Sequence, residues 1–287
     1  VVVYRHQGVD NEGDEAQMVY QFSLPPLVLH AVHSQDVSTL RQWAASLALP
    51  STKTTWFNFL ASHDGIGLNP LRGILPESEI LSLVEKLQTE GALVNWKNNP
   101  DGTRSPYEIN VTYLDALSTR ESHDSERIAR FILAHAVLLS FPGVPAVYIQ
   151  SILGSRNDYD GVERLGYNRA INREKYAAGQ IDCALEDKNS LRYQVYSALS
   201  QLIVLRRAEK AFHPDSEAYF STSGKHVLKI VRVADCGEKI TALFNFSDNS
   251  QTVESDIHSG RELISGKDIT DTTLILNPWQ VLWIKEN

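Results

Sequence analysis

The sequence has little of the features that mark several large classes of protein. Two cysteines occur among 287 residues, Cys183 and Cys236, and they form neither a CxxC motif nor a Cys/His pattern with metal-ligand spacing. Disulfide frameworks and structural zinc sites depend on such patterns. We therefore expect a reducing, cytoplasmic setting and no metal ion or other cofactor.

Long apolar runs and basic clusters are also missing. No apolar run reaches the roughly 18 residues that a transmembrane helix requires. Lys and Arg number 27 against 35 Asp and Glu, which gives a formal charge of −8. Because nucleic acids and anionic membranes bind basic surfaces, we expect neither as a partner and expect small molecules instead.

The first residues do not resemble a natural N-terminus. Position 1 is Val rather than Met, and residues 1–4 form an apolar Val-Val-Val-Tyr run. Such a run is typical of an interior β-strand. We expect the chain to be part of a longer one.

Hydrophobic residues make up 43% of the chain, which is enough for a substantial core. Up to about residue 210, segments with strand-like and helix-like hydrophobic periodicity alternate. Period-2 and compact apolar runs predict strands at 16–22, 54–59 and 146–149, the first stopped by Pro25 and Pro26. Helical periodicity begins near residues 27, 38, 76, 125 and 189. His135 lies on the apolar stripe of the fourth helix, so we expect a buried core histidine.

Two polar segments, 95–106 and 154–176, are predicted to be loops. After residue 211 the pattern changes to short strands at 227–231, 240–246, 273–276 and 281–284, with turn residues between them. Strands without intervening helices predict an antiparallel sheet or small sandwich. We therefore expect a domain boundary near residues 210–214.

Alternating strands and helices predict parallel β-α units, but only three are visible. A closed (β/α)₈ barrel needs eight. The pattern alone leaves open whether the chain forms an open α/β sheet of its own or part of a barrel.

Residues 62–67, Ser-His-Asp-Gly-Ile-Gly, follow the strand predicted at 54–59. Polar side chains at the C-terminal end of a parallel strand commonly enter a functional site. An Asp-Gly turn that only caps the strand is the alternative.

Four motifs occur together in one order: residues 62–67, Tyr-Glu-Ile-Asn-Val-Thr-Tyr at 107–113, Pro-Gly-Val-Pro-Ala-Val-Tyr at 142–148 and Ala-Ile-Asn-Arg at 170–173. Their order and spacing resemble those of sucrose-phosphorylase-like enzymes of the α-amylase superfamily, glycoside hydrolase family 13. The resemblance runs from about residue 14 to the strands at 273–284.

For the fold, the resemblance implies the C-terminal part of such an enzyme. Residues 1–210 would form the last three β-α units of a (β/α)₈ TIM barrel, and residues 211–287 a small antiparallel β domain. The nucleophilic Asp and the acid/base Glu of the family would precede this chain. Glu12 and Glu15 lie in a polar run and are expected to be solvated loop charges.

For the site, the resemblance implies that Asp64 is a carboxylate that stabilises the transition state of glucosyl transfer. His63 would orient the sugar ring, with a packed strand-end residue as the alternative. Arg173 would hold the far side of the glucosyl ring, with a surface ion pair as the alternative.

The acceptor site would include Tyr107 and Glu108, and the 95–107 loop is expected to help build it. Family members specific for sucrose usually carry Gln where this chain has Glu108. We therefore expect the acceptor to be glycerate or a phosphorylated fructose at least as readily as fructose itself. A solvated loop carboxylate is the other interpretation of Glu108.

For the function, the resemblance implies a retaining phosphorylase that transfers an α-glucosyl group from a sucrose-like glucoside to inorganic phosphate, giving glucose 1-phosphate. An α-glucosidase or amylase-like hydrolase and a non-catalytic sugar-binding module are the alternatives. We expect the isolated chain to be inactive, and to pair with another copy or with the missing barrel half.

Overall fold

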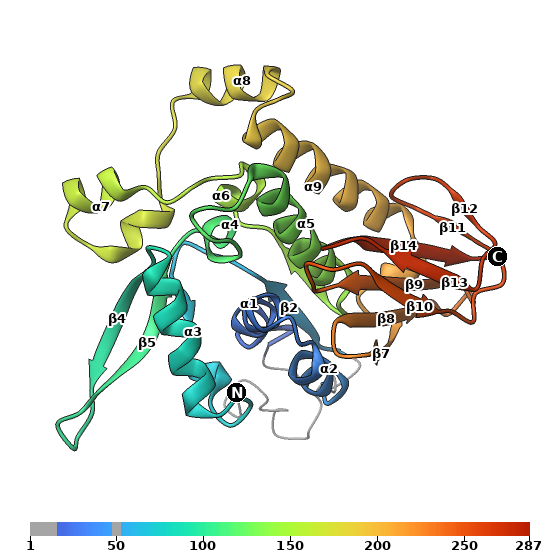
Figure 1. Cartoon of the computed structure of the whole chain (residues 1–287), viewed down its shortest axis with the longest axis horizontal. Helices are drawn as coiled ribbons and strands as arrows, with labels where there is room; N and C mark the ends of the chain where they lie inside the picture. Colours follow the sequence, from blue (N-terminus) through green and yellow to red (C-terminus); the bar gives the residue numbers. More distant parts are fainter. Residues whose placement is uncertain (1–15, 48–52) are drawn as a thin grey trace.

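The computed structural model describes residues 16–47 and 53–287. The expectations for residues 1–4, Glu12 and Glu15 therefore lie outside the described residues. The described chain combines a small parallel sheet with surrounding helices, a projecting β-hairpin and a large antiparallel sheet that ends at the C-terminus (Figure 1).

The parallel sheet contains three strands in the order β1 (Met18–Tyr20), β2 (Thr55–Phe59) and β6 (Val144–Ala146). Both neighbours of β2 run parallel to it. The three predicted strands and their parallel pairing are thus confirmed. The third spans 144–146 instead of the predicted 146–149, and it ends early because Tyr148 is already the N-cap of the following helix.

The five helices predicted from periodicity are present. They are α1 (Leu24–Ser34), α2 (Ser38–Ala45), α3 (Glu77–Thr89), α5 (Asp124–Ser140) and α9 (Leu191–Ala208). Pro25 and Pro26 do not stop a strand as predicted but lie in the first turn of α1. Proline suits that turn because its missing N–H has no partner there in any case.

Short helices occupy much of the chain between these elements. They are α4 (Tyr113–Ala116), α6 (Ile149–Ile152), α7 (Tyr159–Leu165), α8 (Ala178–Glu186), η2 (Asn69–Leu71), η3 (Asn168–Asn172) and η4 (Lys210–Phe212). The loop predicted at 154–176 is therefore wrong. The Asp158 carboxylate caps α7 by accepting from Gly161 N at 2.7 Å, and η3 buries Ala170 and Ile171.

The loop predicted at 95–106 is also wrong. β4 (Leu93–Asn98) and β5 (Arg104–Asn110) form an antiparallel hairpin, and β3 (Ile66–Gly67) pairs with the other edge of β5. The hairpin tip carries the polar turn residues Asp101 and Gly102, which misled the prediction. Cross-strand pairing, invisible to local composition, gives the flanking polar residues their strand conformation.

The C-terminal part contains the antiparallel sheet that was predicted. Its six strands lie in the order β12 (Asp268–Ile269), β11 (Gly260–Glu262), β14 (Val281–Glu286), β9 (Lys239–Asn245), β8 (Val227–Val233), β7 (Glu217–Ser223). A separate pair joins β10 (Gln251–Glu254) and β13 (Thr273–Leu276).

One hydrophobic core extends from the helices around the parallel sheet into the antiparallel sheet. Helix α5 occupies its centre, in contact with α1, α9 and β9 (Figure 1). His135 on α5 is 1% exposed and its Nδ1 lies 2.9 Å from Phe131 O, which confirms a core histidine. Within residues 16–47 and 53–287, no helix has the length and apolarity needed to cross a membrane.

Candidate active site

Asp64 lies where the chain leaves β2 and turns toward β3. Its backbone N–H donates to Ser62 Oγ at 3.1 Å, which shapes the turn. A cavity of about 180 Å³ opens beside it, and its lining includes Asp64 and the aromatic residues Phe22 and Phe59. The end of the central parallel strand thus carries a carboxylate into a partly apolar hollow.

Two arginines bind the Asp64 carboxylate. Oδ1 accepts from Arg169 Nη1 at 2.6 Å and lies 3.4 Å from Arg173 Nη2. The Asp64 side chain is 41% exposed, and no described residue donates to its second oxygen, Oδ2. One carboxylate oxygen is therefore held in place while the other can accept a hydrogen bond from a ligand hydroxyl.

Arg169 connects Asp64 to a second carboxylate, that of Glu108. Arg169 Nε donates to Glu108 Oε2 at 3.2 Å and Nη2 donates to Oε1 at 2.8 Å. Such a forked pair fixes the guanidinium plane, and the hydrogen bond with Glu108 raises the pKa of Arg169. Sequence reasoning missed Arg169, although a second arginine four residues before Arg173 was an available signal.

Glu108 is buried beneath the site, at 4% exposure. Besides the two Arg169 bonds, Oε1 accepts from Gly65 N at 3.1 Å and Oε2 from Asn95 Nδ2 at 2.7 Å. The interpretation of Glu108 as a solvated loop carboxylate is therefore wrong. With four donors and little exposure, Glu108 acts on its surroundings through Arg169 and Asn95.

Gly65 leaves the space that Glu108 occupies. A Cβ at this position would lie 2.6 Å from Glu108 Cγ and 2.7 Å from Ile109 O. These distances are well inside van der Waals contact, so the hexapeptide requires glycine here for close approach to β5.

The other predicted site residues lie near Asp64 and differ in exposure: they are His63, Arg173 and Tyr107. The His63 side chain is 71% exposed, and its Nε2 lies 3.7 Å from Asp64 Oδ1. Arg173 Nε donates to His63 O at 2.6 Å, which ties Arg173 to the turn instead of leaving it in an isolated surface ion pair. Tyr107 is half-buried on β5, where its carbonyl accepts from Leu68 N at 2.9 Å.

Asn172 and Tyr148 support the turn from two further segments. Asn172 Nδ2 donates to the carbonyls of Ser62 and Asp64, each at 3.1 Å. Tyr148 Oη donates to Asn172 O at 3.2 Å, and burial raises the pKa of this phenol. The four motifs found in the sequence therefore meet in one place.

The site combines one partly exposed carboxylate, two guanidinium groups and an aromatic wall. This set suits a polyhydroxylated ligand beside an anionic group. No cluster of three or more His, Cys, Asp or Glu side chains in the described part of the chain is arranged to hold a metal ion.

Comparison with characterised proteins finds close sequence relatives but no matching family model. The chain is 67% identical over 272 residues to the glucosylglycerate phosphorylase of Escherichia coli strain K12, covering 95% of this chain and 49% of that protein. It is 31% identical over 219 residues to the sucrose phosphorylase of Agrobacterium vitis, covering 73% and 41%. The chain thus spans about half the length of the relatives it matches.

Solved structures share the fold. The sucrose 6F-phosphate phosphorylase of Thermoanaerobacter thermosaccharolyticum superposes with a TM-score of 0.71 at 21% identity, over 96% of this chain and 50% of that one. The α-amylase of H. orenii gives 0.61 at 12% identity, over 94% and 49%. The fold class predicted from the resemblance, part of an amylase-like barrel followed by an antiparallel β sheet, is confirmed.

Proposed function

Because the chain belongs to the sucrose-phosphorylase-like family of the α-amylase superfamily, we propose that it forms the Asp64 side of the active site of a glucoside phosphorylase. The reaction transfers an α-glucosyl group to inorganic phosphate. The bond between glucosyl C1 and the acceptor oxygen breaks, a bond from C1 to a phosphate oxygen forms, and glucose 1-phosphate leaves. The family resemblance assigns the nucleophile and the acid/base to residues outside this chain.

The placement of Asp64 carries this proposal. In glucosyl transfer the sugar hydroxyls become more acidic as positive charge develops on the ring, so a carboxylate that accepts from them binds the transition state more tightly than the substrate. Asp64 lines the cavity, its Oδ2 has no donor among the described residues, and its Oδ1 is held by Arg169. His63 and Arg173, beside it, orient the ring.

We further propose that the acceptor is glycerate rather than fructose. The identity of 67% to a glucosylglycerate phosphorylase supports this choice, as does the departure at Glu108 from the glutamine of sucrose-specific relatives. Arg169 and Arg173 remain 40% and 30% exposed, so both guanidinium groups can meet an anionic acceptor. Glycerate and phosphate are both anions, whereas fructose is neutral.

A chimera tests the proposal, in which this chain replaces the matched half of the E. coli relative. We expect glucosylglycerate to be converted to glucose 1-phosphate only when phosphate is present, with sucrose a much poorer substrate. Glucose release that is indifferent to phosphate would favour the hydrolase alternative. Binding of glucosylglycerate without any turnover would favour the non-catalytic alternative.

In the same chimera, Asp64→Asn should lower kcat by about a hundredfold or more with a smaller change in KM, because the lost interaction strengthens in the transition state. Asp182→Asn, at an exposed position on α8, is the matched control and should keep full activity. An unchanged kcat for the Asp64 variant would contradict the assigned role.

A further inference from the structure

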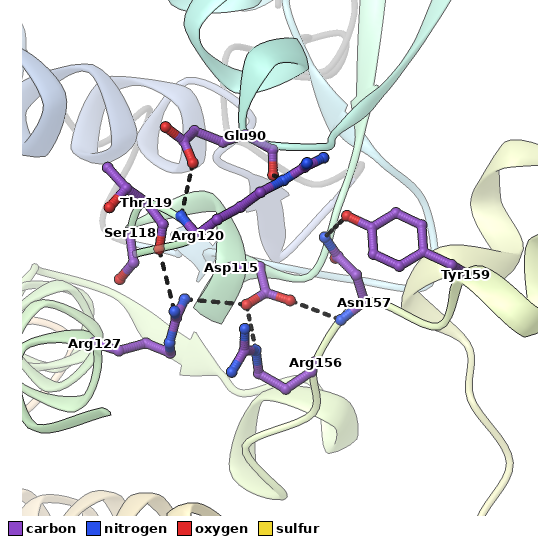
Figure 2. A pocket seen from close by; sticks show the side chains of 9 residues that line it. All are labelled: Glu90, Asp115, Ser118, Thr119, Arg120, Arg127, Arg156, Asn157 and Tyr159. Carbon is purple, nitrogen blue, oxygen red and sulfur yellow. Dashed lines mark hydrogen bonds and ion pairs between the residues drawn. The ribbon is translucent and has the colours of Figure 1, made fainter. Parts of the chain in front are cut away.

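A second cavity, of about 450 Å³, shares no lining residue with the cavity beside Asp64. It lies between the C-terminal end of α3, the segment that joins α4 to α5, and the residues that lead into α7 (Figure 2). Nothing in the proposed glucosyl transfer uses it.

Three arginines from separate segments line this cavity: Arg120, Arg127 and Arg156. Two of them share one carboxylate, since Asp115 Oδ1 accepts from Arg127 Nη1 at 3.2 Å and from Arg156 Nε (Figure 2). Asp115 Oδ2 accepts from Asn157 N at 2.7 Å. The Asp115 carboxylate thus accepts three hydrogen bonds and holds Arg127 and Arg156 in place.

The cavity lining contains more arginines than carboxylates. Glu90 is the other lining carboxylate, and its Oε2 accepts from the backbone N–H of Arg120 at 2.7 Å. The lining thus contains three guanidinium groups and two carboxylates, and the exposed carboxylate of Asp124, outside the lining, lies 3.8 Å from Arg127 Nε. The Arg156 side chain is 46% exposed, and none of the described residues accepts from its Nη atoms, so these donors are available to a ligand.

Two buried polar atoms at the cavity also lack hydrogen-bond partners among the described residues. They are Ser118 Oγ and Arg127 Nε, in residues that are 1% and 2% exposed. The nearest carboxylate oxygen to Arg127 Nε is Asp124 Oδ1, an ion-pair contact at 3.8 Å that is too long for a hydrogen bond. Burial, and then repulsion from Arg156, lowers the pKa of Arg127. Unpaired buried donors are costly, and negative charge in the cavity would relieve both the desolvation and the repulsion.

We propose that this cavity binds a small phosphate anion, either inorganic phosphate or the phosphate group of a small monoester. Guanidinium groups bind phosphate oxygens through pairs of N–H donors, and the two Nη atoms of Arg156 offer such a pair. Thr119, Asn157 and Tyr159 add neutral polar groups at the rim. This site is independent of the proposed glucosyl transfer, in which phosphate is a substrate at the Asp64 site.

Isothermal titration calorimetry of the purified chain with inorganic phosphate, and separately with glycerol 1-phosphate, tests the proposal. The titrations are repeated with an Arg169→Gln variant, which is intended to remove phosphate binding at the Asp64 site. We expect binding to persist there and Arg156→Gln to weaken it about tenfold, because one charged hydrogen-bond donor group is lost. The monoester arm decides whether the cavity takes the free ion or an esterified phosphate.

Arg72→Gln is the matched control, since Arg72 is also an exposed arginine in an ion pair, with Glu77. It should leave the phosphate affinity unchanged, and all variants should keep the parental circular dichroism spectrum. If Arg156→Gln misfolds, Arg156→Lys, which keeps the charge but loses the fork, should still weaken binding. The proposal is overturned if Arg169→Gln removes all binding, if correctly folded Arg156 variants bind like the parent, or if sodium chloride reproduces the heats.

Discussion

At the scale of single residues, Gly65 and Glu108 show how one missing side chain positions a charged one. Glu108 Cγ occupies the space where a Cβ on Gly65 would lie, and Gly65 N donates to the Glu108 carboxylate. This carboxylate in turn fixes Arg169, and Arg169 fixes Asp64. The geometry of the candidate site therefore depends on a glycine that carries no chemistry of its own.

We expect Gly65→Ala to lower the free energy of unfolding by about 1–3 kcal/mol, because the added methyl overpacks the site. Gly67→Ala is the matched control. A Cβ there would meet its nearest neighbour, Pro70 Cδ, at an ordinary 3.9 Å. Urea denaturation of both variants checks the prediction, and equal effects would contradict it.

One buried histidine, His135, and one half-buried histidine, His33, make stability depend on pH. Burial lowers the pKa of His135 from 6.5 to about 4, and burial does the same for His33. Above pH 6.5 both histidines are neutral in the folded and in the unfolded chain. As the pH falls from 6.5 toward 4 the unfolded chain gains protons that the folded chain does not, so stability is lost, by up to about 3 kcal/mol for each histidine.

Replacing His135 by Leu should therefore flatten the pH dependence of unfolding between pH 6.5 and 4 by about half, since one of the two groups is removed. The comparison is with His258→Leu, at an exposed position. Urea midpoints measured across this pH range provide the readout. An unaltered pH slope in the His135 variant would contradict the argument.

At the scale of elements, the C-terminal end of α5 is held by arginines instead of a glycine cap. Arg232 on β8 is fully buried, and Nη1 donates to Ser140 O at 2.9 Å, while its other nitrogens donate to three further carbonyls. Arg206 on α9 donates to Leu139 O at 2.8 Å. The positive charge of these arginines also complements the negative end of the helix dipole. Their hydrogen bonds join β8 and α9 to the C-terminal end of α5.

Arg232→Met should destabilise the chain by about 3 kcal/mol, because it leaves several buried carbonyls without donors. Arg207→Met, at an exposed position on α9, should change the free energy of unfolding by no more than about 0.5 kcal/mol. Denaturation at pH 7 measures both. A similar small effect for the two variants would show that Arg232 is dispensable.

At the scale of the whole molecule, the parallel sheet leaves apolar surface uncovered. Met18, Tyr20 and Phe22 are 49%, 59% and 54% exposed, and the Tyr20 ring contacts those of Phe22, Phe57 and Phe59. Within the described residues, β1 and β6 each pair only with β2, so both sheet edges are open. Open edges and exposed aromatic side chains favour association.

We expect the purified chain to self-associate, or to bind the half of a relative that it does not match. Sedimentation velocity should show mass that increases with concentration. Replacing both Tyr20 and Phe22 by Ser should reduce this association, whereas Tyr219→Ser, at a residue 56% exposed on β7, should not. A compact monomer at all concentrations would contradict the prediction.

The sequence by itself determined the features that depend on neighbours a few residues apart. The hydrophobic periodicity predicted the parallel strands, five of the helices and the buried His135, and the ordered motifs indicated the family. The division into residues 1–210 and 211–287 and the roles of Asp64, His63, Arg173, Tyr107 and Glu108 remain predictions. Local composition misled where polar residues formed the β4–β5 hairpin, because strand pairing is not a local property.

Only the tertiary structure decided how the site residues contact one another. Arg169 binds Glu108, which lies 61 residues away in the sequence, and Asp64, which lies 105 residues away. Contacts at such sequence separations produce no periodic pattern in the sequence. The same is true of the arginine-lined cavity, whose charges come from separate segments. A periodic pattern records which face of an element is buried, whereas the pairing of charges depends on how the chain folds back on itself.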